Sequence, residues 1–451
     1  MKQMKWLKEQ SHRAHTRRDE RERQGRRFAI TLLLYTTTLK PIPMLAAPTM
    51  DTQQQETQDT AADTFPGQPA FLREKHIQYF KRNLQMLPQP YTSQDTFRMT
   101  LGLFVLGGLD LLGCLEESIS VANREAWIEW IYSQQRIPSK DSPSEDNEAL
   151  YGFGGPFSGL AFKENTDGHQ NLGCECDSHT TPYDTAHLTM TYTALVSLII
   201  LGDDLSRVAR EPIIRSLKKL QQPDGCFIPC ITDYEPDMRF VYCACAVSYI
   251  LNDWSGVDRP SLLNFIRESQ TYEHGVAQRP RHEAHGGTTY CAIASLGLMG
   301  GDAFLDQKTM VRQEGETESA FEERRARAGF VDLEGTRRWC LQRQTTGFQG
   351  RTNKPTDTCY SFWLGGAVAA IGSFDLVNFE CNRGFLMETQ NKAIGGFGKW
   401  VDTFPDVLHS YMGIASLGLM GEPGIRQLDP LLNVSKRVEE RLHNETVFWK
   451  K

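Results

Sequence analysis

A repeat of close to 49 residues, which begins beyond residue 183, limits the folds that are open to this chain. The octapeptide Ile-Ala-Ser-Leu-Gly-Leu-Met-Gly occurs twice, at 293–300 and at 414–421. An aromatic residue recurs at intervals of 50, 48, 72 and 49 residues, at Tyr192, Tyr242, Tyr290, Phe362 and Tyr411. A unit of this length is a pair of helices that buries its apolar face only against its neighbours. The sequence therefore predicts stacked helical hairpins.

The second helix of each predicted pair is rich in aromatic and small residues, which suits a crowded inner ring better than an exposed outer one. No alternating pattern of useful length predicts strands, so we expect an all-α fold. Closure of the hairpins into an α/α barrel is favoured over an open solenoid. A glutamine and a glycine-rich turn precede the inner helices, at Gln222, Gln270, Gln344 and Gln390.

Composition separates an ordered body from a flanking N-terminal segment. Residues 1–27 carry ten Lys or Arg against four acidic residues, and a polar tract follows Met50, which is an alternative start. We expect residues 1–68 to be a disordered extension. Its charges disfavour a signal or transit peptide, and the apolar run at 28–39 is too short to span a bilayer.

The barrel is expected over residues 69–444, with a tail at 445–451. The one long interval of the repeat contains an acid- and Arg-rich stretch, residues 302–327, which is typical of a solvated surface insertion. With 49 basic and 56 acidic residues, the chain lacks the net charge of a nucleic-acid-binding protein.

Eleven cysteines are scattered through the chain without the spacing of a disulfide framework. This usage favours reduced thiols and a cytoplasmic location. A cluster of Cys174 and Cys176 with His179 and His187 is a possible metal site, although its spacing matches no common zinc pattern.

A second candidate metal site begins where Asp357 stands two residues before Cys359, at the start of an aromatic, apolar helix. His409 follows fifty residues later. Carboxylate, thiolate and imidazole are all zinc ligands, and three protein ligands leave the fourth position open, as in catalytic sites. The alternative is that Asp357 only caps a helix and that Cys359 is a small buried apolar residue.

The repeat brings polar residues to one height around the predicted ring. Five residues before each aligned aromatic stand His187, Asp237, His285, Asp357 and Asp406. Here the helix N-termini favour anions. Capping would explain the aspartates but not the cations at Arg239, Arg351, Lys354 and Lys399. These cations, with Tyr360 and His285, could grip a diphosphate, above an apolar funnel lined by Phe104, Tyr192 and Tyr242.

From about Phe71 to about Leu442, the chain resembles the β-subunit family of the protein prenyltransferases, most closely its type I geranylgeranyltransferase branch. The motifs that carry the resemblance are Asp237-Met-Arg-Phe-Val-Tyr-Cys-Ala, His285-Gly-Gly-Thr-Thr-Tyr-Cys-Ala-Ile-Ala-Ser-Leu, Gly350-Arg-Thr-Asn-Lys-Pro-Thr-Asp-Thr-Cys-Tyr-Ser-Phe-Trp, Leu201-Gly-Asp-Asp-Leu-Ser-Arg-Val and Leu432-Asn-Val-Ser.

The resemblance implies a role for each matching residue. The zinc ligands would be Asp357, Cys359 and His409, with the fourth position taken by the cysteine of the protein substrate. The diphosphate would be bound by His285, Arg351, Lys354 and Tyr360, with Lys399 in place of the magnesium that farnesyltransferases use. The isoprenoid wall would be Thr100, Phe104, Tyr192 and Tyr242, where Thr100 leaves room for a fourth isoprene unit. The substrate peptide would contact His187, Thr189, Phe240 and Arg239.

The implied activity is transfer of geranylgeranyl from geranylgeranyl diphosphate to the cysteine of C-terminal CaaX proteins, such as Rho/Rac-type small GTPases, with Leu preferred at the end. The implied enzyme is an obligate heterodimer with a helical α subunit, with one Zn²⁺ per β subunit and no need for magnesium. Met412 follows Tyr411 where relatives usually have an aromatic residue, which leaves the preference at the last CaaX position open.

Four alternative functions remain at this point. Within the protein prenyltransferases, the nearer alternatives are the Rab-directed relative and a farnesyltransferase β subunit, and Thr100 and Lys399 disfavour farnesyl transfer. A noncatalytic helical-repeat scaffold would bind a peptide on its inner face and give the metal residues no role. A terpene cyclase would need an Asp-rich run, which we do not find, and would leave Cys359 unused.

Overall fold

The computed structural model describes residues 68–138, 150–155, 174–175, 185–300, 315–320 and 332–450. All of them belong to one compact unit, residues 63–451. The expected N-terminal extension lies outside the described residues except for Gln68, and so does most of the insertion expected at 302–327.

Within the described residues, twelve helices alternate between an outer and an inner position, as the repeat predicts. The outer helices are α2 (Arg73–Gln85), α5 (Val121–Ser133), α7 (Arg210–Leu220), α9 (Arg259–Ser269), α13 (Leu333–Leu341) and α15 (Phe379–Thr389). The inner helices are α3 (Arg98–Leu111), α6 (Leu188–Leu201), α8 (Met238–Ile250), α10 (Gly286–Gly300), α14 (Thr358–Ala370) and α16 (Val407–Met420).

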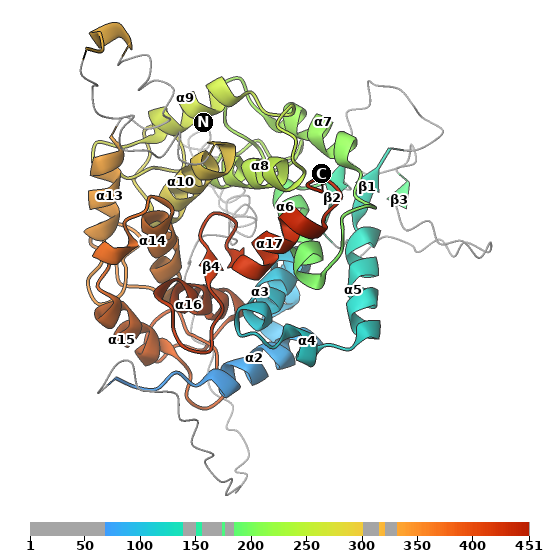
Figure 1. Ribbon diagram of the computed structural model, residues 1–451, viewed down its shortest axis with the longest axis vertical. Helices are drawn as coiled ribbons and strands as arrows, with labels where there is room; N and C mark the ends of the chain where they lie inside the picture. The colour runs from blue at the N-terminus through green and yellow to red at the C-terminus, as the bar shows by residue number, and fades with distance from the viewer. Residues whose placement is uncertain are drawn as a thin grey trace, which may run out of the picture. The chain divides into compact units, whose positions relative to one another are not determined.

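The inner helices form a closed ring. Each packs on the next in the order α3, α6, α8, α10, α14, α16, and α16 returns to α3 (Figure 1). This arrangement confirms the predicted α/α barrel. The inner helices are buried on every side, and in α6 every residue is buried, as expected of helices that are apolar all round. The outer helix α7 is amphipathic and turns Lys218 and Lys219 away from its buried Ile213 and Leu217.

Glutamine side chains tie successive outer helices together. The amide of Gln221 donates to Asp258 O at 2.9 Å and accepts from Asp258 N–H at 2.7 Å, at the start of α9. Equivalent paired bonds are made by Gln135 to Arg207 and Ala209, by Gln270 to Asp332, by Gln344 to Asn378 and by Gln390 to Ala70 and Leu72. The bonds of Gln390 join the last outer helix to the first and so close the outer ring.

In one unit, the glutamine named in the sequence pattern is not the one that makes these bonds. Gln222 lies at the turn before α8, and its amide donates to Leu220 O at 3.1 Å. Gln221 makes the inter-helix bonds instead, because it is the residue that ends α7, as Gln270 ends α9 and Gln390 ends α15.

The remaining elements are short. They are η2 (Gln89–Phe97), α4 (Leu115–Ser118), η4 (Phe374–Leu376) and α17 (Lys436–Glu445), with strands β1 (Gln135–Ile137), β2 (Gly152–Phe153), β3 (Cys174–Glu175), β4 (Leu428–Asp429) and β5 (Val434–Ser435). Strand β1 lies between β2 and β3, and β4 pairs with β5 as a hairpin. These strands are the exception to the predicted all-α fold.

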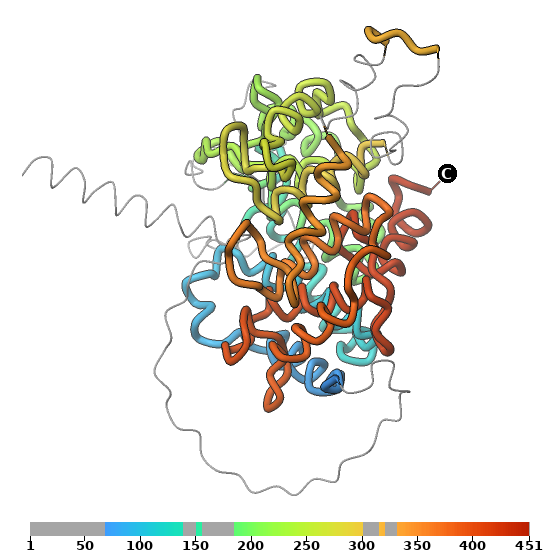
Figure 2. Tube along the Cα trace, turned by 90° about the vertical axis from the view of Figure 1, so that its left-hand side faces the viewer, coloured from blue at the N-terminus to red at the C-terminus, as the bar shows by residue number. Residues whose placement is uncertain are grey.

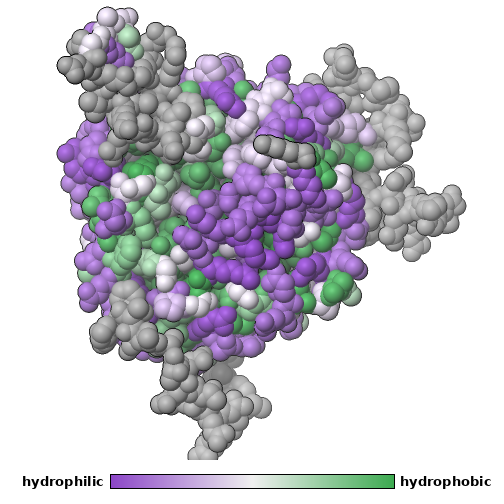
Figure 3. All heavy atoms as spheres, viewed as in Figure 1, coloured by the Kyte–Doolittle hydropathy of each residue, from purple (hydrophilic) through white to green (hydrophobic). Residues whose placement is uncertain are grey.

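The C-terminal segment gathers at one end of the barrel (Figures 1 and 2). The polar helix α17 presents a hydrophilic surface there (Figure 3). Buried Asp110 on α3 fixes this segment, because it accepts hydrogen bonds from Arg426, Arg437 and Ser435. Residues 446–450 remain in contact with the barrel, since Trp449 Nε1 donates to Ile250 O at 3.2 Å. None of the helices in the described residues is long and apolar enough to cross a membrane.

Candidate active site

Asp357, Cys359 and His409 meet at the end of the barrel where the inner helices begin, which we call the mouth. Asp357 caps α14, Cys359 lies in its first turn, and His409 lies in the first turn of the neighbouring helix α16. One donor atom from each residue lies within 4.8 Å of the other two, and all three side chains are buried. Residues fifty positions apart therefore present a carboxylate, a thiol and an imidazole to one point.

The imidazole of His409 is held so that one nitrogen remains available. Its Nδ1 lies 2.6 Å from Asp406 Oδ2, and Asp406 is itself fixed because it accepts the His409 backbone N–H at 2.9 Å. Nε2 lies 3.3 Å from Asp357 Oδ1, but this contact lacks hydrogen-bond geometry, and the buried nitrogen has no other partner among the described residues. A carboxylate on the outer nitrogen of a histidine is the arrangement that orients metal ligands.

The protonation of the three residues fits a site from which a metal displaces protons. Burial, together with the Asp357 charge, raises the pKa of the Cys359 thiol to about 12. Burial alone would lower the pKa of His409, but the carboxylates of Asp406 and Asp357 raise it well above its ordinary value. Burial acts to raise the pKa of Asp357, yet the charge of His409 holds it below the usual range. Metal binding would remove protons from the thiol and the imidazole.

Cations surround this cluster at different distances. Lys399 Nζ lies 3.7 Å from Asp357 Oδ2 and 4.6 Å from the centre of the Trp400 ring. Arg351 pairs with Glu283 at 2.8 Å, and Lys354 is exposed on the same loop. The loop of Lys399 is anchored at the start of α14, because Thr358 N–H donates to Lys399 O at 3.1 Å.

Tyr360 and His285 form a hydrogen-bonded pair beside the cluster. Tyr360 Oη lies 2.8 Å from His285 Nε2, and His285 Nδ1 accepts the Gly287 backbone N–H at 3.0 Å. Burial, followed by the charges of Arg351 and Arg239, lowers the pKa of His285 to about 3, so the ring is neutral. With Nδ1 accepting, the proton of this neutral ring is assigned to Nε2, which then donates to the Tyr360 oxygen.

The observed position of the Tyr360 ring requires glycine at position 350, because the ring occupies the space that a side chain would need. A Cβ atom on Gly350 would lie 2.0 Å from Tyr360 Cζ, and one on Gly286 would lie 3.1 Å from its Cδ1. Any other residue at Gly350 would displace the ring and with it the hydroxyl group.

The four residues predicted for the isoprenoid wall lie on three consecutive inner helices, α3, α6 and α8. Thr100 Oγ1 lies 3.9 Å from Met190 Sδ, and the Phe104 ring stacks on Tyr411 with centres 5.6 Å apart. The hydroxyls of Tyr192 and Tyr242 lie 3.2 Å apart. These four side chains therefore contact residues of neighbouring inner helices.

The residues predicted to contact the peptide lie across the ring from the metal cluster, on α6 and α8. His187 caps α6, and its ring meets Phe240 edge-on at 6.3 Å. Cys243 Sγ lies 3.9 Å from Thr189 Oγ1. Arg239 pairs with buried Asp237 at 2.5 Å. The mouth thus has two sides, with the metal residues on α14 and α16 and the peptide residues opposite.

The recurring polar position has a capping role throughout. Backbone N–H groups are accepted by the side chains of His187, Asp237, His285, Asp357 and Asp406. For Asp357 the two interpretations of the sequence are compatible, because Oδ1 accepts the Cys359 N–H at 3.0 Å while the carboxylate still faces His409.

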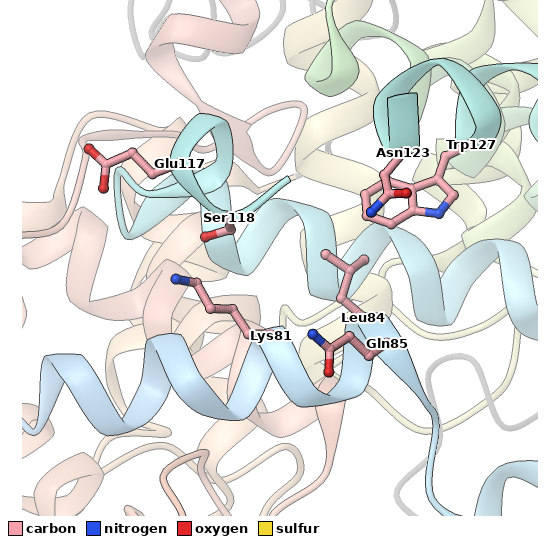
Figure 4. Close-up of a pocket in the computed structure, with 7 residues that line it drawn as sticks. All are labelled: Lys81, Leu84, Gln85, Glu117, Ser118, Asn123 and Trp127. Atoms are coloured by element: carbon pink, nitrogen blue, oxygen red, sulfur yellow. The ribbon is translucent and has the colours of Figure 1, made fainter. Parts of the chain in front are cut away.

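Two other candidate sites do not contribute to the cluster. Cys176 and His179, from the second possible metal site, lie outside the described residues, and the described part of the chain has no other group of three potential ligands. A pocket of about 370 Å³ lies between α2, α4 and α5, but none of the predicted site residues lines it (Figure 4).

The sequence did not predict the contact between Asp406 and His409. Nor did it predict that Tyr290 and Tyr411 donate hydrogen bonds to the backbone carbonyls of Pro430 and Asn433. The repeat carried a signal for both, since it placed Asp406 at the capping position and the two tyrosines at the aligned aromatic position. It could not show which backbone groups they reach.

Comparisons with known proteins agree with this geometry. The family model described as the prenyltransferase alpha-alpha toroid domain matches residues 71–434. A geranylgeranyl transferase type-1 subunit beta of Dictyostelium discoideum is 38% identical over 376 residues, which cover 81% of this chain and 95% of the relative. That of Arabidopsis thaliana is 37% identical over 368 residues, covering 81% and 89%.

A solved structure gives the same result. The Candida albicans protein geranylgeranyltransferase-I complexed with GGPP matches with a TM-score of 0.67 and 25% identity, covering 85% of this chain and 100% of that chain. The chain therefore belongs to the prenyltransferase alpha-alpha toroid family and, within it, to the type-1 geranylgeranyl transferase β subunits, which are protein prenyltransferases.

Proposed function

We propose that this chain is the catalytic subunit of a zinc-dependent enzyme that transfers geranylgeranyl from its diphosphate to the cysteine of CaaX proteins. The observation that carries the proposal is the convergence of Asp357, Cys359 and His409, in which the buried His409 Nε2 makes no hydrogen bond of good geometry and lies 3.3 Å from Asp357 Oδ1. Three such donors suit zinc with one position open for a substrate. A zinc ion held there would bind the substrate cysteine and keep it as a thiolate at neutral pH.

The residues of the chain then act on the leaving group. In the reaction, a carbon–sulfur bond forms at C1 of the isoprenoid, the carbon–oxygen bond to diphosphate breaks, and the thiol proton is lost. Tyr360, oriented by neutral His285, donates a hydrogen bond to the departing diphosphate, and Arg351, Lys354 and Lys399 offset its charge. The ammonium group of Lys399, 3.7 Å from a ligand carboxylate, supports its role as a fixed cation in place of magnesium.

The isoprenoid would extend from the mouth along the ring axis, past Thr100, Phe104, Tyr192 and Tyr242. The CaaX peptide would enter on the opposite side and end against His187, Thr189 and Phe240, with Arg239 nearby. Phe240 and the half-buried, neutral imidazole of His187, whose pKa is lowered to about 4 by desolvation, form a surface suited to a terminal Leu.

We infer that the chain works with an α subunit in the cytoplasm. The identity of its relatives as subunits supports a partner. The nine cysteines whose side chains the structure describes are all free thiols, which supports a reducing compartment. We assign the chemistry to residues 69–444 and none of it to 1–68 or 302–327.

The test is co-expression of this chain with an α subunit from a type-1 relative. The purified heterodimer is offered geranylgeranyl or farnesyl diphosphate with matched peptides ending in Leu or Met. We expect about one zinc per heterodimer and highest kcat/KM for geranylgeranyl with the Leu peptide. Preference for farnesyl with Met would indicate a farnesyltransferase, and peptide binding without turnover or zinc would indicate a scaffold.

A further inference from the structure

His76 on α2 is completely buried against the loop that follows the outer helix α15. Its Nδ1 lies 3.1 Å from the Gly396 backbone nitrogen and accepts that N–H, and its Nε2 lies 3.3 Å from Gln390 Oε1. The imidazole ring stacks between two aromatic rings, with centres 4.9 Å from Phe71 and 4.5 Å from Phe397. One side chain of α2 therefore contacts residues 314 and 320 positions later in the chain.

The two nitrogens of this imidazole have different roles. Burial, which the hydrogen bond to Gln390 opposes only in part, lowers the pKa of His76 to about 4, so the ring is neutral. Because Nδ1 accepts the Gly396 N–H, the single proton is assigned to Nε2, which donates to Gln390 Oε1. The ring is therefore an acceptor for the loop and a donor to the residue that ends α15.

The loop that the imidazole contacts, residues 394–399, is rich in glycine and ends at Lys399. Gly395 and Gly396 have φ angles of 75° and 81°, in the left-handed region that glycine adopts readily. A Cβ atom on Gly395 would lie 2.1 Å from Lys75 O, so the loop backbone lies directly against α2. Since glycine gives a backbone more freedom than other residues, contacts from outside the loop must fix the position of the lysine.

Further hydrogen bonds hold the loop against α14 and α16. The Phe397 N–H donates to Ser410 Oγ at 2.9 Å. Thr358 donates through Oγ1 to Gly398 O at 2.7 Å and through its N–H to Lys399 O at 3.1 Å. These bonds fix the end of the loop, whereas the imidazole on α2 fixes its middle.

We infer that His76 is a positioning residue for Lys399. The inference rests on the proposed function, in which the Lys399 ammonium group offsets the charge of the departing diphosphate in place of magnesium. Its Nζ lies 3.7 Å from Asp357 Oδ2, so a shift of the loop would move it relative to the metal cluster and the diphosphate together. With only 15% of its side chain exposed, the lysine has little freedom to compensate for a displaced backbone. A displacement of about 1 Å can lower a rate about 10²-fold.

The first test removes the acceptor nitrogen but keeps an aromatic ring. In the heterodimer, assayed with geranylgeranyl diphosphate and a peptide ending in Leu, His76→Phe should lower kcat about 10- to 100-fold. Added Mg²⁺ should restore most of this loss, because the ion supplies the charge that the displaced ammonium group no longer provides. Bound zinc should stay at the wild-type level. His76→Asn, whose amide oxygen can occupy the Nδ1 position, should keep most of the wild-type kcat without Mg²⁺.

Phe80→Leu is the matched control for a weakened α2. Phe80 is also completely buried on this helix, but its ring lies against α3, where a Cβ atom on Gly108 would be 2.4 Å from Phe80 Cζ. This variant should lower the melting temperature, leave kcat close to the wild-type value and show no response to Mg²⁺. A response to Mg²⁺ in both variants would overturn the inference, because a weakened helix alone would explain it.

The second test asks whether the effect of His76 passes through Lys399. Lys399→Ala should lower kcat and make the enzyme respond to Mg²⁺. In that background His76→Phe should change neither kcat nor the response to Mg²⁺, whereas losses that multiply would overturn the inference. If His76→Phe reduces the yield of folded heterodimer, Phe397→Leu removes the stacked ring from the loop side and should produce the same response to Mg²⁺.

The outcomes separate the inference from the function on which it depends. If the wild type transfers geranylgeranyl but His76→Phe loses kcat without recovery in Mg²⁺, His76 does not position Lys399. Equal losses in His76→Asn and His76→Phe lead to the same conclusion. If Lys399→Ala shows no response to Mg²⁺, the role assigned to the lysine is wrong and the inference fails with it. If the wild type transfers no isoprenoid, the proposed function itself fails.

Discussion

The two ends of the barrel treat buried charge differently. At the far end, Asp110 accepts bonds from two arginines and a serine, and Arg383 makes paired bonds to Glu422 at 2.7 and 2.8 Å. At the mouth, His409 Nε2 lies 3.3 Å from Asp357 Oδ1 without hydrogen-bond geometry, and Lys399 Nζ stays 3.7 Å from Asp357 Oδ2. The buried carboxylates at the far end are closely bonded to arginines, whereas the charged groups at the mouth are only loosely paired.

This difference indicates that the mouth is the region where the arrangement of polar groups lowers stability in favour of function. Buried polar groups are almost always hydrogen-bonded, and an unpaired one costs about 1–3 kcal/mol. A fold that pairs its buried charges closely at one end, and leaves charged groups loosely paired at the mouth, is suited to bind a ligand at the mouth. The comparison predicts that variants at the mouth affect chemistry and that variants at the far end affect folding.

The largest expected effect follows loss of a metal ligand. Cys359→Ala should reduce bound zinc far below one per heterodimer and lower kcat/KM at least about 10³-fold, because two remaining ligands hold the ion poorly. Metal analysis and steady-state kinetics measure both quantities. Cys340→Ala is the control, since Cys340 is also fully buried but lies on α13; equal zinc loss in both variants would contradict the assignment.

The next effect should appear in stability alone. Asp110→Ala removes the buried acceptor of Ser435 and leaves the partly exposed Arg426 and Arg437 with Glu116 alone, and it should lower the free energy of unfolding by about 1–3 kcal/mol, as measured by urea titration. Glu211→Ala, which removes an exposed pair 3.9 Å long, should change it by less than about 0.5 kcal/mol. Zinc content per folded Asp110→Ala protein should be unchanged, and a loss of zinc there would break the comparison.

A smaller effect tests how His285 works. Tyr360→Phe should lower kcat about 10²-fold. His285→Gln should retain most activity, because a neutral amide can donate from the Nε2 position, whereas the shorter His285→Asn should not. In the Tyr360→Phe background, His285→Gln and His285→Asn should each lower kcat only slightly further. If His285→Gln is as impaired as His285→Asn, or if the losses add, His285 acts on the diphosphate directly.

The smallest expected effect is the release of protons from the ligands when zinc binds. In the metal-free protein the pKa of His409 is raised, so its charged form contributes stability below the unfolded pKa, near 6.5, and this contribution disappears as the pH rises through the folded value. The raised pKa of Cys359 means that a thiol is present at neutral pH. Zinc binding at pH 7 should therefore release about two protons. Calorimetry in buffers of different ionisation enthalpy measures the number, and release of none would exclude this ligand set.

The repeat predicted more of the fold than of the site. The spacing of Tyr192, Tyr242, Tyr290 and Tyr411 correctly placed inner helices at one height, because a helical hairpin has a fixed length. Periodicity alone could not assign the glutamine bonds to Gln221 instead of Gln222, since that choice depends on where α7 ends. The short strands were also missed, because segments of two or three residues carry no alternation that a pattern can detect.

At the site, residue types predicted the donors but not their orientation. Asp357 and Cys359 could be paired from their spacing, whereas their contact with His409 depends on α14 and α16 being neighbours in a closed ring. The protonated nitrogen of His285 depends on the Gly287 N–H, a backbone group that no side-chain pattern reports. Tyr290 donates a hydrogen bond to Pro430 O across a separation of 140 residues, and no local sequence pattern predicts such a contact.

The bond between Gln390 and Leu72 links residues separated by 318 positions. A linear array of repeats needs polar caps because its two terminal faces have no neighbour, but here each terminal unit serves as the cap of the other. During synthesis, helix α2 must wait for nearly the whole chain before its permanent partner emerges, so the early repeats expose an apolar flank throughout translation. Deletion of the final repeat should consequently harm the beginning of the barrel as much as its end.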